Sequence, residues 1–443
     1  MGWGYRSAVA TATLALALAS AAAPAAAFDA HGSARQVYVT GLQAGAQTTL
    51  LDSAGKTVAT RNADAQGGLL FRDVKPGGGY RVNSGGQPSD PLTVLSNAAA
   101  PPSTDVYNQT IPNAGYGYLT TRDGTKLAID VHPPQDVAQA LPTGFQLPPL
   151  PVDKPAPTLI EYSGYGYANP AGPTNGIAAI ANIMGFTVVD VNMRGTGCSA
   201  GAFDFFEPLQ NLDGYDVIET IARQPWVLNH KVGMMGISYG AISQLFTAQL
   251  KPPSLAAISP LSVIDATQTT LYPGGVLNTG FAVDWAKERQ HEALPASADG
   301  GQDWAYKRIQ EGDQTCAANQ ALHGQAADLL AKIRANNHYK PKIVDPLTPS
   351  KFVQKIDVPV FMACQWEDEQ TGGHCPTLVK RFTGTTRKWF TFTNGAHVDS
   401  LDPETFNRWY DFLELYVAKQ APITNSGPVR AAAPVIFRTS VGQ

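Results

Sequence analysis

A serine at position 238 stands in a pattern that turns a hydroxyl into a nucleophile. Residues 231–240 read Lys-Val-Gly-Met-Met-Gly-Ile-Ser-Tyr-Gly, so an apolar strand-like run leads into Gly-x-Ser-x-Gly, and a helix-forming segment follows. This context is typical of a nucleophile elbow, in which a sharp turn lifts the serine above a sheet. Such a turn needs residues without bulky side chains close to the serine, and Gly236 and Gly240 meet this need. We therefore expect Ser238 to attack a carbonyl carbon; the alternative is a packing turn with an inert serine.

A serine nucleophile needs a general base, and on scaffolds with this elbow the chain order is serine, acid, histidine. Of the eight histidines, His397 follows the last predicted strand, in a loop that reads Thr-Asn-Gly-Ala-His. His374 competes with it but lies one strand earlier. We expect His397 to take the proton from Ser238.

The third member should be a carboxylate that follows a late strand and reaches the histidine ring. Residues 358–363 form such a predicted strand, and the loop after it reads Cys-Gln-Trp-Glu-Asp-Glu. Asp368 is the expected acid, with Glu369 and Glu367 as alternatives in the same loop. Asp265, after the preceding strand, is a further alternative.

The elements that position these residues follow from the alternation of strands and helices after about residue 110. Such alternation predicts a mostly parallel sheet with helices on both faces. We expect the fold class α/β and the α/β-hydrolase fold, with a core formed by residues 110–263 and 351–420. The predicted strands are residues 158–162, 186–192, 231–236, 255–258, 358–363 and 388–393, after an antiparallel hairpin at 116–131 that has an Asp-Gly turn.

The alternation stops between residues 264 and 350, where the composition favours helices. This stretch is too long for an ordinary connection. Trp285, Trp304 and Leu329 need burial, which argues against a disordered insertion. We expect a helical cap inserted into the core.

The first 27 residues predict a targeting segment rather than part of the fold. One basic residue, Arg6, precedes an Ala/Leu-rich run at 7–23, and three small residues end at Ala27. This is the pattern of a secretory signal peptide cleaved near Ala27, so we expect a secreted protein; the alternative is an uncleaved anchor. No other stretch approaches 18 apolar residues, so no stable membrane span is expected.

Residues 28–105 show short alternating runs between turns rich in Asp, Gly and Pro. This pattern predicts a small all-β, sandwich-like module that precedes the core. Nothing in it indicates catalysis. Two interpretations stay open: a structural spacer, or a module that contacts carbohydrate or the cell wall.

The composition excludes several classes of partner. The 443 residues carry a formal net charge of −4, with 44% hydrophobic and 15% charged residues. Nucleic acid is therefore not expected as a partner, and neither is wholesale disorder. The four cysteines form no Cys-x-x-Cys pair and have no second ligand pair at zinc spacing, so we expect no metal site. The serine chemistry needs no cofactor.

Export would place the cysteines in an oxidising compartment, where an even number favours disulfides. Cys364 ends a predicted strand, and Cys375 lies eleven positions later, after a Thr-Gly-Gly turn that can reverse the chain. We expect these two to clip the loop that carries Asp368, which leaves Cys198 and Cys316 to tie the core to the cap. Other pairings and four buried thiols are the alternatives.

Several blocks together resemble the X-prolyl dipeptidyl-peptidase and cocaine-esterase-like family of α/β-hydrolase serine hydrolases, which includes the α-amino acid ester hydrolases. The resemblance spans roughly residues 114–415 and leaves out 28–105. Its blocks are residues 190–201, similar to the family's R-G-x-G-x-S-x-G segment; 213–216, similar to D-G-Y-D; 224–226, similar to Q-P-W; 236–239, similar to G-x-S-Y; and 358–368, similar to its acid-bearing segment.

The sequence departs from this family in two places. The family usually has its second elbow glycine three residues after the serine, whereas here Gly240 is two after it and Ala241 occupies the third position. The family also usually carries a C-terminal jelly-roll domain. Residues 421–443 resemble only the start of one, so we expect a truncated C-terminal β domain there.

The resemblance implies an oxyanion hole made of one backbone N–H and one tyrosine hydroxyl. The N–H would be that of Tyr239, and the hydroxyl maps to Tyr165, with Tyr162 and Tyr167 as neighbouring alternatives. A phenolic O–H can donate to a developing oxyanion as an amide can. Arg194 would either bind a substrate carboxylate or tie loops together.

The expected protein is thus a secreted serine hydrolase that cleaves an ester or amide, in a small molecule or a peptide, through an acyl-enzyme. One alternative is an Xaa-Pro dipeptidyl-peptidase, which would need an anionic pocket for the substrate ammonium group; Asp284 and Glu288 of the cap are candidates. An alternative of another class is an inactive secreted protein that binds the cell wall or a partner through its β module.

Overall fold

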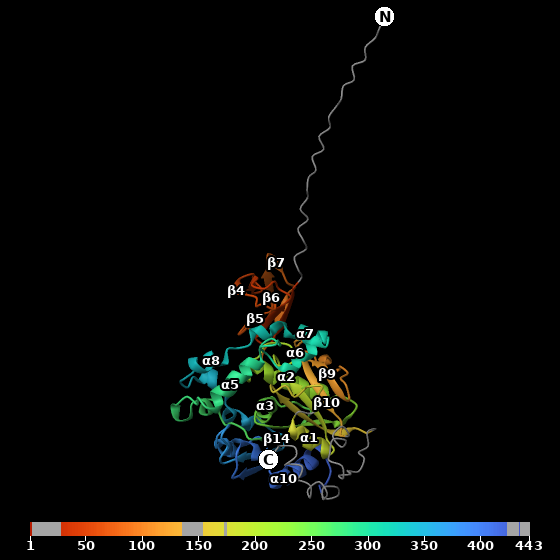
Figure 1. Ribbon diagram of the computed structural model, residues 1–443, viewed down its shortest axis with the longest axis vertical. Helices are drawn as coiled ribbons and strands as arrows, with labels where there is room; N and C mark the ends of the chain where they lie inside the picture. The colour runs from red at the N-terminus through yellow and green to blue at the C-terminus, as the bar shows by residue number, and fades with distance from the viewer. Residues whose placement is uncertain (2–27, 135–153, 172–174, 423–433, 435–443) are drawn as a thin grey trace.

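The computed structural model describes residue 1 and residues 28–134, 154–171, 175–422 and 434. The expected signal peptide and the expected start of a C-terminal β domain therefore lie almost entirely outside the described residues. Figure 1 shows the N-terminal β module resting against the helical cap and the core.

An eight-stranded sheet forms the core, with its strands in the order β16-β15-β14-β13-β11-β12-β10-β9. Neighbouring strands from β16 to β12 in this order run parallel, whereas β10 pairs antiparallel with both β12 and β9. The mostly parallel sheet expected for an α/β-hydrolase fold is confirmed. The strands are β9 (Gly115–Thr120), β10 (Lys126–His132), β11 (Ala156–Ser163), β12 (Thr187–Asn192), β13 (Val227–Ile237), β14 (Leu255–Leu261), β15 (Val360–Gln365) and β16 (Lys388–Thr393).

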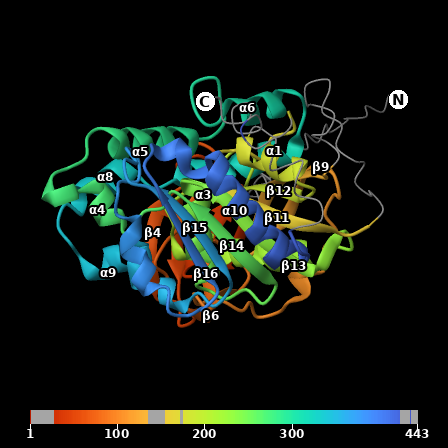
Figure 2. The same ribbon diagram turned by 90° about the horizontal axis from the view of Figure 1, so that it is seen from below.

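Helices cover both faces of this sheet, because successive apolar residues of each strand point to opposite sides. In β12, for example, Val188 packs in one apolar cluster with α1 and α10, while Val189 packs in another with α2 and α3. Figure 2 shows α10 lying across the strands. The helices are α1 (Gly176–Ile183), α2 (Pro208–Ala222), α3 (Tyr239–Ala248) and α10 (Pro403–Leu413), which a π-helical turn at Glu414–Ala418 extends.

The chain between β14 and β15 forms the helical cap. A disulfide between Cys198 and Cys316 joins the core to the cap, which is the pairing that the sequence analysis predicted. Beside it, the Asn319 side chain donates to the carbonyl oxygen of Cys198 at 2.8 Å. Across the described part of the chain, no helix is both long and apolar enough to cross a membrane. The cap helices are α4 (Thr267–Leu271), α5 (Phe281–Glu292), α6 (Asp303–Gln310), α7 (Gln314–Asn319), α8 (Leu329–Ala335) and α9 (Pro341–Val344).

The N-terminal module consists of small antiparallel sheets around an apolar core of its own. One sheet has the order β1-β2-β5; the other has the order β4-β3-β6-β7, and β8 pairs with β6. The all-β nature of this module, expected from its short alternating runs, is confirmed. Its strands are β1 (Asp29–Ser33), β2 (Gln36–Thr40), β3 (Gln47–Leu51), β4 (Thr57–Asn62), β5 (Leu69–Phe71), β6 (Gly77–Ser84), β7 (Gln87–Pro88) and β8 (Leu92–Val94).

The module is docked against both the core and the cap. Ser33 Oγ donates to Asp123 of the core at 2.5 Å. Arg72 bridges all three parts, because one guanidinium nitrogen lies 2.8 Å from the carboxylate of Glu207 and another lies 3.2 Å from the carbonyl oxygen of Gln325 in the cap. An apolar contact accompanies these bonds, formed by Leu70 of the module, Ala202 of the core and Leu322 of the cap.

Candidate active site

Ser238 occupies the sharp turn between β13 and α3. Its backbone has φ 59° and ψ −117°, a conformation that residues with a side chain rarely adopt and that stores strain. Gly236 precedes the turn with φ 149°, and an added Cβ there would lie 2.6 Å from the carbonyl carbon of Gly240. The local geometry is that of a nucleophile elbow.

Gly240 is needed for a different reason. An added Cβ would lie 2.1 Å from Oε1 of Glu161, a side chain of β11 that is 1% exposed. Ala241, which stands where the family usually has glycine, is fully buried in the apolar core. The glycine is therefore required two residues after the serine, because the buried carboxyl group of Glu161 packs under the first turn of α3.

Asp368 and His397 are joined as carboxylate and imidazole. Nδ1 of His397 lies 2.8 Å from Oδ2 and 3.0 Å from Oδ1 of Asp368, and both side chains are buried. Asp368 also accepts hydrogen bonds from the backbone N–H and the hydroxyl of Thr371. Burial alone would raise the pKa of Asp368, but the hydrogen bond and charge of His397, together with Thr371, hold that pKa below its usual value. The carboxylate is therefore ionised at neutral pH and aligned with the ring.

None of the alternative residues for the acid or the base takes the place of Asp368 or His397 in this hydrogen-bonded pair. Glu369 accepts from the backbone N–H of His397 at 3.0 Å, not from its ring. Glu367 and His374 are exposed. Asp265 accepts hydrogen bonds from two threonine hydroxyls.

The loops that carry the nucleophile and the histidine meet at the end of β14, a strand that lies between β13 and β16 in the sheet. Ser238 N–H donates to the carbonyl oxygen of Leu261 at 2.9 Å. Ser262, the residue after Leu261, donates through its hydroxyl to the carbonyl oxygen of His397 at 3.1 Å. The loops after β13, β14 and β16 therefore meet at one edge of the sheet. This edge, at the carboxyl ends of parallel strands, is where open α/β sheets place their ligands.

One contact of a complete triad is not made in this structure. Among the described residues, Nε2 of His397 is buried without a hydrogen-bond partner, so it has no bond to Ser238 Oγ. Nε2 is the ring atom left for the serine, since Asp368 holds Nδ1. Hydrogen bonds of this kind are often long without substrate and tighten when substrate binds.

Tyr165 is the tyrosine that reaches the nucleophile. Its hydroxyl donates to Ser238 Oγ at 3.4 Å, whereas the hydroxyl of Tyr162 donates to a backbone carbonyl in α2. Tyr167 packs beside Tyr165, with 5.6 Å between the ring centres. Tyr239 begins α3, so its N–H belongs to the first turn, where N–H groups have no partner within the helix. An N–H and an O–H donor thus both lie next to Ser238.

The sequence indicates only that Trp285 needs burial, whereas the structure places it in contact with Tyr165. It lies on the cap helix α5, and its indole N–H donates to the hydroxyl of Tyr165 at 3.3 Å. Its ring stands edge-on to that of Tyr239, with the centres 5.3 Å apart. No local spacing indicates this contact, because Trp285 and Tyr165 are 120 positions apart.

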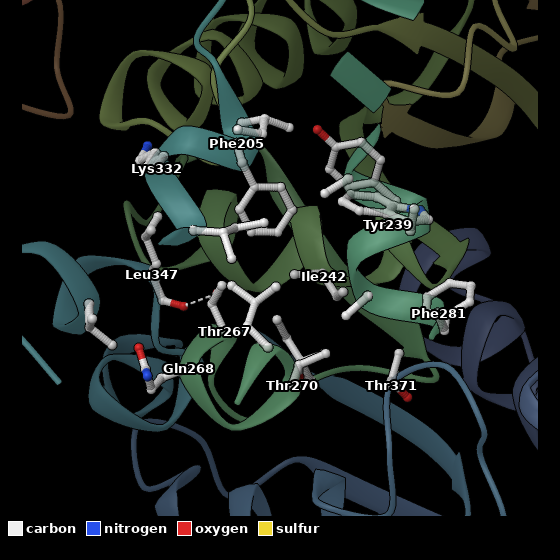
Figure 3. Close-up of a pocket in the computed structure, with 18 of the residues that line it drawn as sticks. Phe205, Tyr239, Ile242, Thr267, Gln268, Thr270, Phe281, Lys332, Leu347 and Thr371 are labelled. Atoms are coloured by element: carbon white, nitrogen blue, oxygen red, sulfur yellow. Dashed lines mark hydrogen bonds between the residues drawn. The ribbon is translucent and has the colours of Figure 1, made fainter. Parts of the chain in front are cut away.

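A cavity of about 130 Å³ lies under the cap, and Ser238 is one of the residues that line it. Figure 3 shows this cavity with Phe205, Tyr239 and Phe281 among its lining side chains. None of the described residues that line it is an aspartate or a glutamate. Some of its polar side chains are engaged elsewhere: Thr267 donates to the carbonyl oxygen of Leu347, and Lys332 forms an ion pair with Asp204 at 2.6 Å. The apolar side chains of the wall include Phe205, Ile242, Phe281, Leu329, Ile333 and Leu347.

Arg194 ties loops together. Its guanidinium group is buried and pairs with Asp213 at 2.7 Å and with Asp123 at 3.0 Å. It also donates to the hydroxyl of Thr125 at 2.8 Å. These bonds occupy the guanidinium group, so of the two interpretations the structure favours the structural one over a contact with a substrate carboxylate.

A disulfide joins Cys364, within β15, to Cys375, so it closes the loop that carries Asp368.

Among the described residues no cysteine is free, and no cluster of three or more His, Cys, Asp or Glu side chains could hold a metal ion. The groups that the site offers for chemistry are the hydroxyl of Ser238, the imidazole of His397, the carboxylate of Asp368 and two hydrogen-bond donors.

Comparisons with known proteins find one matching family and two curated relatives. The family described as X-Pro dipeptidyl-peptidase (S15 family) matches residues 123–399. A Mycobacterium bovis protein named as a serine esterase is 29% identical over 195 residues, which cover 41% of this chain and 29% of that protein. A Mycobacterium tuberculosis protein of the same description gives the same values. The match thus spans less than a third of the length of these curated relatives.

Solved structures show the same fold. A CocE/NonD family hydrolase from Staphylococcus aureus is similar with a TM-score of 0.52 and 20% identity, over 69% of this chain and 50% of that one. An aminopeptidase from a marine sediment Thaumarchaeota archaeon is similar with a TM-score of 0.50 and 15% identity, over 73% of this chain and 58% of that one.

Proposed function

Because this chain belongs to the X-Pro dipeptidyl-peptidase (S15) family of hydrolases, we propose that it is a secreted serine esterase whose nucleophile, base and acid are Ser238, His397 and Asp368. One observation carries the proposal: a strained serine elbow lies at the same sheet edge as a buried histidine–carboxylate pair, and Nε2 of that histidine has no hydrogen-bond partner among the described residues. The two disulfides support an extracellular location, because such bonds persist mainly in oxidising compartments.

In the acylation step, Ser238 Oγ attacks the ester carbonyl carbon while its proton passes to Nε2 of His397. The π electron pair of the carbonyl moves to the oxygen, which accepts hydrogen bonds from the N–H of Tyr239 and the hydroxyl of Tyr165. Asp368 holds the ring in the tautomer with a proton on Nδ1 and stabilises the imidazolium. When the intermediate collapses, the C–O bond to the alcohol breaks, and the proton on Nε2 goes to the departing oxygen.

In the deacylation step, water repeats the sequence. His397 takes one proton from the water, whose oxygen attacks the acyl carbon of the ester on Ser238. The bond to Oγ then breaks, and Oγ recovers its proton from Nε2. The products are a carboxylic acid and an alcohol, and the enzyme returns to its starting state.

The cavity supports an uncharged substrate with an apolar acyl group. Most of its wall is built from aliphatic and aromatic side chains, and burial of an apolar group gains roughly 0.8 kcal/mol per methylene. A peptide with a free N-terminal ammonium group would instead need a carboxylate partner, since an unpaired buried charge is costly.

The cap carboxylates that could have served a dipeptide do not face this cavity. Asp284 pairs with Lys287 at 2.7 Å, and Glu288 pairs with Arg289 at 2.8 Å; both carboxylates are exposed. Neither belongs to the cavity wall. These contacts favour an ester substrate over an Xaa-Pro dipeptide.

The test combines labelling with a substrate panel. A fluorophosphonate probe should label the wild-type protein on the peptide that contains Ser238, and Ser238→Ala should abolish both labelling and turnover, since losing a triad serine costs on the order of 10⁶-fold in kcat. Among p-nitrophenyl esters, kcat/KM should rise from acetate to octanoate. Retention of more than about a hundredth of the wild-type kcat by Ser238→Ala would place the nucleophile elsewhere. Faster cleavage of an Ala-Pro p-nitroanilide than of any ester would instead identify a dipeptidyl-peptidase.

A further inference from the structure

The hydroxyl of Tyr165 makes two contacts that define its role. It lies 3.3 Å from the indole nitrogen of Trp285 and 3.4 Å from Ser238 Oγ. An indole N–H can only donate a hydrogen bond, whereas a phenolic hydroxyl can donate one and accept others. Tyr165 must therefore accept from Trp285. Its own hydrogen is left to point toward Ser238, where the oxyanion would form.

Trp285 is itself held by the surrounding aromatic side chains. Its ring stands edge-on to Tyr239 at 5.3 Å and to Phe205 at 5.6 Å between ring centres. Edge-to-face contacts of this kind favour one relative orientation of the rings. The indole N–H is thus aimed at Tyr165 by packing that involves both the cap and the core.

Arg289, one turn further along α5, contacts the same tyrosine from above its ring. Its guanidinium carbon lies 4.9 Å from the ring centre of Tyr165 and 5.7 Å from that of Trp285. A cation over an aromatic face is attracted to the ring, and more strongly where water is excluded. Arg289 is 5% exposed and forms ion pairs with Glu288 and Glu292, each at 2.8 Å. The ring of Tyr165 is therefore fixed as well as its hydroxyl.

We propose that Trp285, assisted by Arg289, is a positioning residue that orients the hydroxyl of Tyr165 as the side-chain donor of the oxyanion hole. The inference rests on the proposed function, because it requires an oxyanion at Ser238. It makes the cap part of the catalytic machinery as well as a wall of the substrate cavity. Catalysis gains from a donor that is already aimed when the charge develops, since no reorientation is needed during the reaction.

The experiment is a double-mutant cycle between Trp285→Phe and Tyr165→Phe, read by kcat and KM on p-nitrophenyl butyrate. Trp285→Phe keeps an aromatic ring but removes the N–H, so kcat should fall about 10-fold, a part of the roughly 10²–10³-fold that a whole oxyanion donor contributes. In the Tyr165→Phe background, the same change should leave kcat nearly unchanged, because there is no hydroxyl left to orient.

Trp226→Phe is the matched control. Trp226 packs against the core just before β13, at the opposite end of that strand from Ser238, and among the described residues its indole nitrogen has no hydrogen-bond partner. The substitution removes the same ring volume without removing a bond, so kcat should stay at the wild-type value in both backgrounds. Arg289→Met gives a second test of the positioning role, because it should lower kcat only when Tyr165 is present. Arg289→Lys should restore part of that loss.

The outcomes separate this inference from the function on which it rests. If Ser238→Ala keeps turnover, the proposed mechanism itself is wrong, and the inference is overturned with it. If Ser238→Ala is inactive but Trp285→Phe lowers kcat by the same factor in both backgrounds, or changes KM alone, the positioning role is overturned and the mechanism stands. Melting temperatures measured for all variants show whether a loss of kcat comes from unfolding, which would also count against positioning.

Discussion

The carboxyl group of Glu161 fills the space in which a side chain at position 240 would begin. Oε1 of Glu161 lies 2.1 Å from where a Cβ on Gly240 would stand, far inside van der Waals contact. The acid is buried, and the hydroxyl of Ser163 donates to its other oxygen at 3.1 Å. Burial, and then the charge of Asp190, raise the pKa of Glu161 well above its usual value. The sheet under the elbow therefore sets which residue types can begin α3.

Gly240→Ala should consequently destabilise the protein and disturb the elbow. The new methyl group would force Glu161 or the first turn of α3 to move, and such overpacking usually costs about 1–3 kcal/mol or more. Urea unfolding and kcat on an aryl ester measure the two effects. Gly77→Ala is the matched control, since its added Cβ would meet only Tyr80, at an ordinary 3.7 Å. Equal stability of the two variants would contradict the proposed clash.

Tyr165→Phe should lower kcat by about 10²–10³-fold with little change in KM, because the hydroxyl acts on the charge that develops in the transition state. Tyr162→Phe is its comparison. That hydroxyl donates to the carbonyl oxygen of Gln210 at 2.9 Å, so its loss should cost about 1 kcal/mol of stability and leave kcat near the wild-type value. A change in KM alone for Tyr165→Phe would assign its hydroxyl to substrate binding instead.

Asp368→Asn should affect both turnover and the pH dependence of stability. Loss of the carboxylate that fixes the tautomer of His397 should lower kcat by about 10⁴-fold. The pKa of Asp368 is lower in the folded state than in the unfolded chain, where it is about 3.9. Its contribution to stability is therefore fully present above that value and is lost as the pH falls through the folded-state pKa.

Urea unfolding between pH 2 and pH 7 tests the second part of this prediction. The free energy of unfolding of the wild type should fall more steeply below about pH 4 than that of Asp368→Asn, because the unfolded chain binds the proton first. Parallel curves for the two proteins would show that the folded state does not favour the ionised carboxylate.

The two disulfides should differ in what their removal costs. Cys364 and Cys375 are 11 positions apart, and Cys198 and Cys316 are 118 apart. In the loop-entropy account, the short loop contributes about 3 kcal/mol and the long one about 5 kcal/mol. Replacing the short-loop pair with alanines should nevertheless lower kcat more, because that loop holds Asp368 against His397 and small displacements in a triad are costly.

Peptide mapping without reduction and urea unfolding of both double-alanine variants test this contrast. Cys364 found as a free thiol, or joined to Cys198 or Cys316, would remove the structural basis of the prediction. A larger loss of kcat from the long-loop pair would show that the attachment of the cap, rather than the position of Asp368, limits turnover.

The predictable parts of the site are the residues whose positions follow from the order of the strands along the chain. Ser238 follows an apolar strand, and Asp368 and His397 each follow a later one; in a parallel sheet, such strand ends meet at one edge. The structure brings Asp368 and His397 within 2.8 Å of each other in this way. The parallel sheet itself was predictable because its strands are short, apolar and separated by helices.

The contacts that could not be predicted join residues whose local sequences give no sign of each other. Glu161 is one charged residue in an apolar strand, and only the packing of β11 under α3 shows that it excludes a side chain at Gly240. The hydrogen bond from Trp285 to Tyr165 depends on how the cap packs against the core, and helical periodicity does not specify this packing. Arg72 and Glu207 likewise meet across 135 positions.

The docking of the N-terminal module limits how this enzyme can be divided for study. A shortened chain that begins at residue 105 would retain every residue proposed for catalysis. It would nevertheless uncover Leu322 and Ala202 and leave the buried carboxylate of Glu207 without Gln36 and Arg72, its partners in the module. A buried polar group that loses its partners lowers stability, and a newly exposed apolar surface favours aggregation. The smallest soluble catalytic unit is therefore expected to be the module, cap and core together.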